Sequence, residues 1–303
     1  MQTILGSGGV IGTELAKNLT QYTDKIRLVS RSPEQVNPTD ETMSADLNIA
    51  EQVNEAVKGS EVVYLTVGLA YKLSVWEKQW PLIMTNVINA CKEHNAKFVF
   101  FDNVYMYGKV DGWMTEETPM NPYSKKGEIR AKIAQQLMDE VNKGNLTALI
   151  ARSADFYGPD ATNTFVHAMV FEKLKNGKKA SWLVNDKVKH SHTYTPDAGK
   201  ATALLGNTES AYNQVWHLPT DRNVLTGKEF IEKIAQAYQV QPKYSVMSKW
   251  VMKMAALFNP LAKESVEMLY QNEYDYLFDS TKFENAFFKA ILYQAGIEKI
   301  VNG

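Results

Sequence analysis

The chain has 303 residues, 45% of them apolar, and a formal net charge of −1 from 33 Lys and Arg against 34 Asp and Glu. This apolar share excludes a mainly disordered chain, and the near-zero charge argues against a dedicated nucleic-acid binder, which is usually basic. The single cysteine, Cys91, excludes an intramolecular disulfide and a thiolate metal cluster and predicts a cytoplasmic protein. No run of about 18 apolar residues occurs, so neither a membrane-spanning helix nor a membrane partner is expected.

Short apolar runs alternate with amphipathic segments through the first half of the chain. The runs are β-branched or aromatic, as buried parallel strands are. They are Thr3–Leu5, Ile26–Ser30, Val62–Val67, Lys97–Asp102 and Leu146–Arg152. Between them, apolar residues recur at helical spacing from Trp76 to Cys91 and from Ile129 to Val141. This alternation predicts an α/β fold of the Rossmann type, with helices on both faces of a doubly wound parallel sheet.

A glycine-rich segment joins the first strand to the first helix. Gly6 permits a tight turn, Gly9 lets the backbone approach a pyrophosphate, and Gly12 lets the helix pack close to the sheet. Free N–H groups at the helix start then hold the phosphates. The segment predicts a dinucleotide site, and the alternative is a glycine turn without a ligand. The predicted cofactor-binding residues are Gly6, Ser7, Gly8, Gly9, Val10, Ile11 and Gly12.

The second strand ends at Ser30-Arg31, where an NAD site usually has an acidic residue for the adenosine ribose. A guanidinium forms bidentate pairs with a phosphate, so Arg31 favours NADP(H), with NAD(H) as the alternative. The other interpretation of Arg31 is a surface arginine without a ligand. Asp46 and Leu47 follow the expected third strand and are predicted to meet the adenine edge, although Asp46 also suits a loop before the next helix.

The second half of the chain is less regular. A helix is predicted over Thr164–Asn176, and strands are predicted at His192–Thr195 and Val215–Leu218. Two pairs, Asn48 with Glu51 and Thr226 with Glu229, have the spacing of a capping box at a helix start. We therefore expect a nucleotide-binding domain over 1–159 plus 190–217, and a smaller C-terminal substrate-binding lobe over 160–189 plus 218–303.

No metal site is predicted from the sequence. His190 and His192 would share one face of a strand, but no third ligand accompanies them. Cys91 lies on the apolar stripe of its helix, which predicts an inert core thiol.

Several ordered motifs resemble the extended short-chain dehydrogenase/reductase superfamily, the NAD(P)-dependent epimerase/dehydratase group. The most specific is the run from Arg152 to Pro159. The others are Gly6-x-x-Gly9-x-x-Gly12, Val104–Gly108, Glu117–Pro119, Pro122–Lys125, Tyr194–Asp197 and Phe278–Phe283. The similarity spans essentially the whole chain.

In that family three residues perform the chemistry. They are a Ser or Thr, a Tyr, and a Lys four residues after the Tyr. The resemblance places Asn103 at the Ser/Thr position, where an amide can still donate a hydrogen bond. Tyr123 matches the family Tyr, but Gly127 stands at the Lys position. We expect Asn103, Tyr123 and Lys126 to be the catalytic residues, with Lys125 as the alternative lysine. The other interpretation of Tyr123 is an aromatic residue at the start of a helix, without a catalytic role.

Relatives that use nucleotide sugars tend to place an Arg where this chain has His190, so a nucleotide-diphosphate sugar is doubtful. The resemblance therefore implies an atypical NADP(H)-dependent oxidoreductase or epimerase/dehydratase-like enzyme for a small carbonyl, alcohol or sugar-like substrate. The unusual Tyr/Lys spacing leaves a catalytically degenerate NADP(H) sensor or partner-binding protein as the alternative. An S-adenosylmethionine methyltransferase is disfavoured, because Arg31 replaces the acidic residue that it needs. Relatives commonly pair as homodimers, and the sequence leaves the oligomeric state open.

Overall fold

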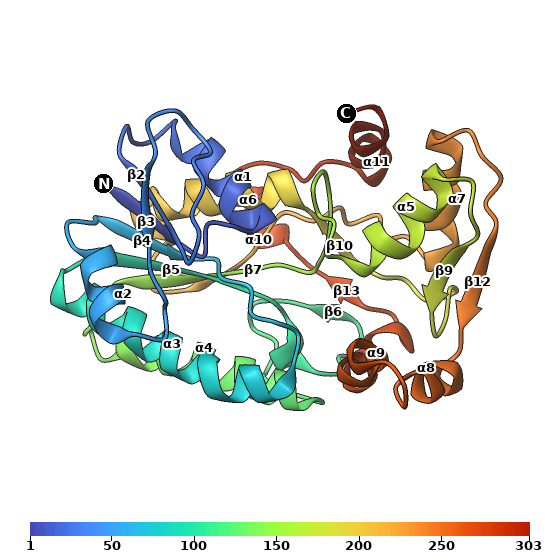
Figure 1. Cartoon of the computed structure of the whole chain (residues 1–303), viewed down its shortest axis with the longest axis horizontal. Coiled ribbons are helices and arrows are strands. Elements are labelled where there is room, and N and C mark those ends of the chain that lie inside the picture. The colour runs from blue at the N-terminus through green and yellow to red at the C-terminus, as the bar shows by residue number, and fades with distance from the viewer.

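The computed structural model describes all 303 residues. Its centre is a seven-stranded sheet in the order β11-β7-β5-β4-β1-β2-β3, and all neighbours are parallel (Figure 1). The strands are β1 (Gln2–Leu5), β2 (Ile26–Ser30), β3 (Glu41–Ser44), β4 (Val62–Leu65), β5 (Lys97–Asp102), β7 (Ala148–Arg152) and β11 (Val215–His217). The order reverses direction between β1 and β4, and a ligand site of such sheets lies at the carboxyl ends of the strands beside that point.

Helices cover both faces of this sheet (Figure 1). They are α1 (Val10–Leu19) and α6 (Thr195–Gly206) on one face, and α2 (Ala50–Val57), α3 (Leu73–Glu93) and α4 (Lys125–Asn142) on the other. Each face has its own buried cluster, of 21 residues beneath α1 and α6 and of 27 beneath α2, α3 and α4. The Rossmann-type α/β fold expected from the sequence is confirmed.

Most of the remaining elements lie beyond the carboxyl ends of the strands, on the right of Figure 1, whereas α10 (Thr281–Ala286) and the turn Glu209–Ala211 pack against the main sheet. Their strands are β6 (Trp113–Met114), β8 (Asp155–Tyr157), β9 (Ala180–Leu183), β10 (His192–Tyr194), β12 (Tyr244–Met247) and β13 (Leu277–Phe278). Their helices are α5 (Glu172–Lys175), α7 (Gly227–Ala237), α8 (Lys249–Ala255), α9 (Pro260–Ser265), α10 (Thr281–Ala286) and α11 (Tyr293–Asn302). Shorter helical turns are Tyr105–Tyr107, His167–Phe171, Glu209–Ala211 and Val266–Asn272.

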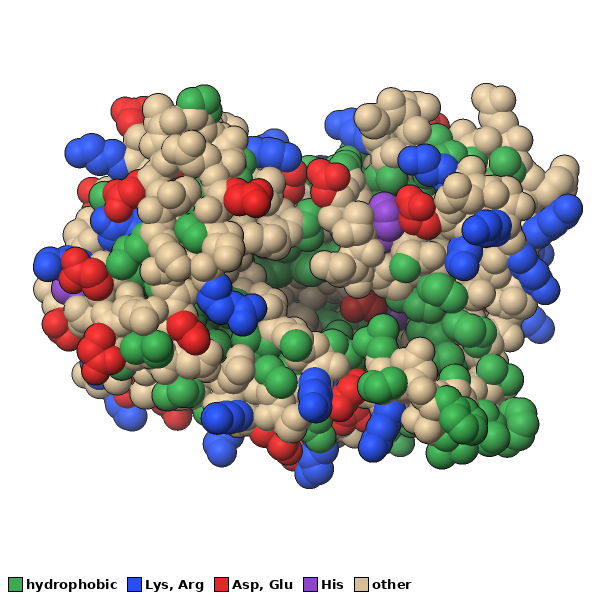
Figure 2. All heavy atoms as spheres, in the orientation of Figure 1, with side chains coloured by type: hydrophobic (Ala, Val, Ile, Leu, Met, Phe, Trp, Pro, Cys, Tyr) green, Lys and Arg blue, Asp and Glu red, His purple; other side chains and the backbone are tan.

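These elements pair as β8 with β10, β9 with β12, and β6 with β13. A buried cluster of 14 residues, which includes Trp182, Phe230 and Tyr293, packs α5, α7 and α11 together. Figure 2 shows a hollow between this part and the main sheet. The exact division of the chain into lobes stays a prediction.

The strands predicted from the sequence are present, with ends that differ by at most two residues. The capping box of Thr226 and Glu229 is confirmed, because the Thr226 side chain accepts from the Glu229 N–H and Glu229 accepts from Thr226 N–H. The box predicted at Asn48 is wrong. The Asn48 side chain donates to Asp46 instead, and Ile49 precedes the first residue of α2.

The segment predicted as one helix over 164–176 contains a π-helical turn, His167–Phe171, before α5. Cys91 is fully buried, as predicted, and burial raises the pKa of its thiol. No helix is both long and apolar enough to span a membrane.

Candidate active site

The glycine-rich segment forms the turn between β1 and α1. Gly6 has φ +94°, and a Cβ there would lie 2.3 Å from Cα of Val67. A Cβ on Gly12 would lie 2.8 Å from Cα of Ser7, so this glycine brings α1 close to the turn. Gly8 and Gly9 face open space, and the Ser7 hydroxyl is buried without a partner. These features fit the phosphates of a dinucleotide at the start of α1, where the N–H groups of Val10 and Ile11 lie in the first helical turn.

Arg31 follows β2, as predicted, and is exposed. Its guanidinium forms no ion pair or hydrogen bond with the protein, whereas its carbonyl accepts from the Ser44 hydroxyl at 3.0 Å. Asp46 lies on the next loop, where its carboxylate accepts from the backbone and side chain of Asn48. These bonds lower the pKa of Asp46, and the charge of Arg31 adds a smaller effect. Leu47 is buried beneath this loop.

Asn103 follows β5 at the carboxyl edge of the sheet. Its side-chain oxygen accepts from the N–H of Tyr105 at 3.1 Å, which leaves its amide group as the available donor. Its own N–H donates to Asp102 at 2.8 Å. Asp102 is fully buried and accepts from Arg130 at 2.8 Å and from Arg152 at 3.4 Å. These buried ion pairs hold Asp102 in place, and Asp102 in turn positions the backbone of Asn103.

The hydroxyl of Tyr107 continues the same network. It accepts from Arg152 at 2.8 Å and lies 2.8 Å from Nε2 of His217. Nδ1 of His217 lies 2.8 Å from the carbonyl oxygen of Asp279 and must donate to it, so Nε2 accepts the Tyr107 proton. Burial lowers the pKa of His217 to about 3, which keeps this arrangement neutral.

Tyr123 and Lys126 are not joined by a hydrogen bond. Tyr123 precedes α4, because Ser124 caps that helix by accepting from Gly127 N–H at 3.0 Å. The Tyr123 side chain is 65% exposed, and its ring contacts that of Tyr270 at a centroid distance of 4.9 Å. Their joint catalytic role stays a prediction.

Lys126 is instead fully buried. Its Nζ donates to Glu264 Oε2 at 2.9 Å and to Glu267 Oε1 at 2.8 Å. It also lies 4.7 Å from the ring centroid of Tyr71. Lys125, the alternative lysine, is exposed and pairs with Glu128. The positive charge of each lysine is therefore already matched by carboxylates.

Asp155 and His190 form a hydrogen-bonded pair at the start of β8. Nε2 of His190 lies 2.8 Å from Oδ2 of Asp155. The His190 side chain is 4% exposed and stacks on the ring of Tyr276, whereas the Asp155 side chain is 40% exposed. Burial favours the neutral acid, but the hydrogen bond from His190 outweighs it and lowers the pKa of Asp155. The carboxylate is therefore an anion that faces solvent, with the histidine behind it.

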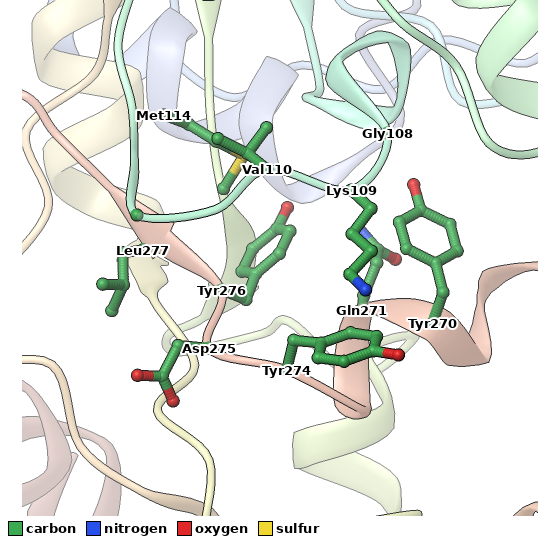
Figure 3. Close-up of a pocket in the computed structure, with 11 residues that line it drawn as sticks. Gly108, Lys109, Val110, Met114, Tyr270, Gln271, Tyr274, Asp275, Tyr276 and Leu277 are labelled. Carbon is green, nitrogen blue, oxygen red and sulfur yellow. The ribbon is translucent and has the colours of Figure 1, made fainter.

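A small pocket lies beside this region, between the loop that begins at Gly108 and the segment 270–277 (Figure 3). Its volume of about 10 Å³ is room for about one water molecule. Lys109 lies over the ring of Tyr274, 3.4 Å from its centroid. This pocket is too small for a metabolite. No group of three or more His, Cys, Asp or Glu side chains is arranged to hold a metal ion.

The model of the NAD dependent epimerase/dehydratase family matches residues 3–216. The chain belongs to this family. The match runs from β1 to β11 and so reaches every strand of the central sheet. Among curated proteins, none matches the sequence.

Solved structures of low sequence identity share the fold of this family member. The dTDP-glucose 4,6-dehydratase DesIV of Streptomyces venezuelae, solved with NAD, has 14% identity and a TM-score of 0.81, over 100% of this chain and 96% of that one. The UDP-glucose 4-epimerase of Thermus thermophilus, also solved with NAD, has 16% identity and a TM-score of 0.80, over 100% and 98%. The UDP-N-acetylglucosamine 4-epimerase of Bacillus cereus has 17% identity and a TM-score of 0.78, over 99% and 95%.

The pairing of Asp155 with His190 was not predicted from the sequence. It depends on the parallel register of β8 and β10, in which Asp155 lies opposite His192. The presence of Asp155 within the Arg152–Pro159 motif was visible, but nothing in the sequence linked it to a histidine 35 residues later. The carboxylates that bind Lys126 were likewise not predicted, because the chain returns to α4 only at residues 264–267.

Proposed function

We propose that this family member is an NADP(H)-dependent oxidoreductase or epimerase/dehydratase-like enzyme for a small carbonyl, alcohol or sugar-like substrate. The turn between β1 and α1 carries the proposal. Two glycines there face open space at the start of a ten-residue helix, and the buried Ser7 hydroxyl has no partner. Similar folds solved with NAD support a nicotinamide dinucleotide at this turn.

The choice of NADP(H) over NAD(H) rests on Arg31. Its exposed guanidinium has no protein partner, and the nearby carboxylate of Asp46 is engaged by Asn48. A free guanidinium suits a 2′-phosphate. We propose that Asp46 and Leu47 border the adenine and that Arg31 binds this phosphate.

The bound cofactor would supply hydride transfer, and the chain would supply position and proton exchange. Asn103 has a free amide donor for a substrate oxygen. Tyr123 has an exposed hydroxyl that can exchange a proton with solvent or substrate. Lys126 would act on this region only through its charge, since its Nζ donates to Glu264 and Glu267. The cytoplasmic location and the homodimer stay predictions from the sequence.

A second candidate function is a catalytically degenerate sensor of NADP(H). The engagement of Lys126 by two carboxylates favours it, because this lysine is then not free to bind a nicotinamide ribose. Such a protein would keep the dinucleotide site and use it to bind a partner.

A thermal-shift titration with NADPH, NADH and S-adenosylmethionine tests the cofactor assignment, because a ligand of the folded state raises the melting temperature. We expect the largest shift with NADPH, and Arg31→Ala should remove the preference over NADH. No shift with either nicotinamide nucleotide would overturn the proposal. A screen of carbonyl and alcohol substrates then separates the candidates, since steady turnover contradicts a pure sensor.

A further inference from the structure

One carboxylate oxygen of Asp155 is free to meet a ligand. His190 donates to Oδ2 at 2.8 Å, and no protein group donates to Oδ1. The side chain is 40% exposed while the side chain of His190 behind it is 4% exposed. Asp155 also follows β7 at the carboxyl edge of the sheet, where ligands of this fold class bind. The geometry therefore presents a fixed acceptor to whatever occupies this edge.

The negative charge of Asp155 acts on four nearby tyrosines, one of which, Tyr276, stacks on His190. Burial is the main cause that raises the pKa of each, and the charge of Asp155 raises it further, so all four hydroxyls stay protonated at neutral pH. They are Tyr71, Tyr105, Tyr270 and Tyr276. The hydroxyls of Tyr270 and Tyr276 are buried without a hydrogen-bond partner. Unpartnered buried polar groups are costly, so these hydroxyls suit a ligand that carries oxygen or nitrogen atoms.

The cations of the neighbouring elements are already engaged by protein groups, and Lys109 lies over the ring of Tyr274, 3.4 Å from its centroid. Lys126 is bound by Glu264 and Glu267. Arg152 is buried and is bound by Asp102 and by the hydroxyl of Tyr107. A phosphate at this place would thus meet the carboxylate of Asp155, while Lys126 and Arg152 are held by their own anionic partners, and like charges brought together oppose binding.

We propose that Asp155, held by His190, determines substrate specificity at this edge. It accepts a hydrogen bond from a hydroxyl or ammonium group of an uncharged or cationic substrate, and it rejects phosphorylated and nucleotide-diphosphate substrates. The inference rests on the proposed function, because it assigns a substrate class to the same site. The neighbouring tyrosine hydroxyls provide further hydrogen bonds, which suits a substrate with several oxygen or nitrogen atoms.

The variant Asp155→Asn tests the inference, because it keeps the shape of the side chain and removes its charge. Binding of UDP-glucose is measured by calorimetry to wild type, to Asp155→Asn and to the exposed control Asp24→Asn, each with and without NADPH. We expect Asp155→Asn to bind UDP-glucose at least tenfold more tightly than wild type and the control. Equal binding by all three proteins, including no binding by any, overturns the inference, as does tight binding by wild type.

Two pairs of sugars test the rejection of phosphate for a substrate with hydroxyl groups and for one that also carries an ammonium group. NADP⁺-linked oxidation of glucose and of glucosamine is compared with that of their 6-phosphates. Wild type should favour the unphosphorylated member of a pair at least tenfold, and Asp155→Asn should lose most of that preference. A preference of wild type for a phosphorylated member contradicts the inference. The NADPH thermal shift of the same samples separates failure of this inference from failure of the proposed function. If NADPH does not shift the melting temperature of wild type, the cofactor assignment is wrong. If NADPH does shift it but Asp155→Asn binds UDP-glucose no more tightly than wild type, only the role of Asp155 is wrong.

Discussion

Lys126 and Glu264 are 138 residues apart in the chain, yet Nζ of the lysine donates to the carboxylate at 2.9 Å. The same carboxylate accepts from the N–H of Leu73 at the start of α3. Glu267 accepts from Lys126 and from the N–H of Lys125 at the start of α4. Two acidic side chains thus lie at two helix N-termini, where negative charge is favourable, and they hold the segment 260–272 against α3 and α4.

The ion pairs of Lys126 predict a stability effect. Removal of one partner from a buried pair typically costs about 3–5 kcal/mol. Because Glu264 and Glu267 are 22% and 24% exposed, we expect Lys126→Met to fall at the lower end of that range. Urea denaturation measures the change. The neighbouring variant Lys125→Met, at an exposed position, should leave the midpoint nearly unchanged, and equal midpoints for both variants would contradict a fastening role.

Tyr123 allows the catalytic hypothesis to be tested without damage to the fold. Its side chain is 65% exposed, so Tyr123→Phe should unfold at the wild-type temperature. If its hydroxyl exchanges the substrate proton, turnover should fall at least ~100-fold, as for other acid–base groups. Tyr22→Phe, another exposed tyrosine, serves as the control. Unchanged turnover in Tyr123→Phe would remove Tyr123 from the mechanism.

The parts of the site that the sequence predicted are local in the chain. The strands and the turn from Gly6 to Gly12 follow from residue type, periodicity and spacing within a few residues. The contacts of Asp155 with His190 and of Lys126 with Glu264 join segments that are 35 and 138 residues apart. Such contacts depend on strand register and on the path of the C-terminal segment, which periodicity does not encode.

Gly9 and Gly12 should separate cofactor binding from stability. A Cβ on Gly9 meets no atom within 4 Å, so Gly9→Ala should keep the wild-type melting temperature but obstruct the approach of a pyrophosphate. A Cβ on Gly12 meets Cα of Ser7 at 2.8 Å, so Gly12→Ala should lower stability by about 1–3 kcal/mol through overpacking. Thermal melts with and without NADPH measure both effects. An undiminished NADPH shift in Gly9→Ala would place the phosphates elsewhere.

The carboxylate of Asp102 is predicted to be essential for the fold beneath Asn103. It is fully buried and accepts from the guanidinium groups of Arg130 and Arg152. Asp102→Asn leaves these two buried cations without an anion and should cost about 3–5 kcal/mol. Urea denaturation provides the measurement, and Asp111→Asn, at an exposed position, provides the control. Near-wild-type stability of Asp102→Asn would show that the cluster contributes little.

The buried histidines predict that stability falls with acidity. Burial lowers the pKa of both His217 and His192 to about 3, whereas the pKa of an unfolded histidine is about 6.5. Between these values the unfolded chain binds a proton that the folded chain does not. The free energy of unfolding should therefore decrease as the pH falls from about 6.5 toward 3, by up to about 1.4 kcal/mol per pH unit for each histidine.

Urea denaturation of wild type and His217→Asn between pH 7 and 4.5 tests this prediction. The variant should be less stable at pH 7, because Tyr107 and the carbonyl of Asp279 lose their partner, but its stability should depend less steeply on pH. His94→Gln, at a partly exposed position after α3, provides the control substitution. All other titrating groups are the same in wild type and His217→Asn, so the difference in slope between the two proteins isolates His217. Parallel curves for wild type and His217→Asn would mean that His217 takes up its proton in the folded chain, and the Tyr107 hydroxyl would then not donate to it.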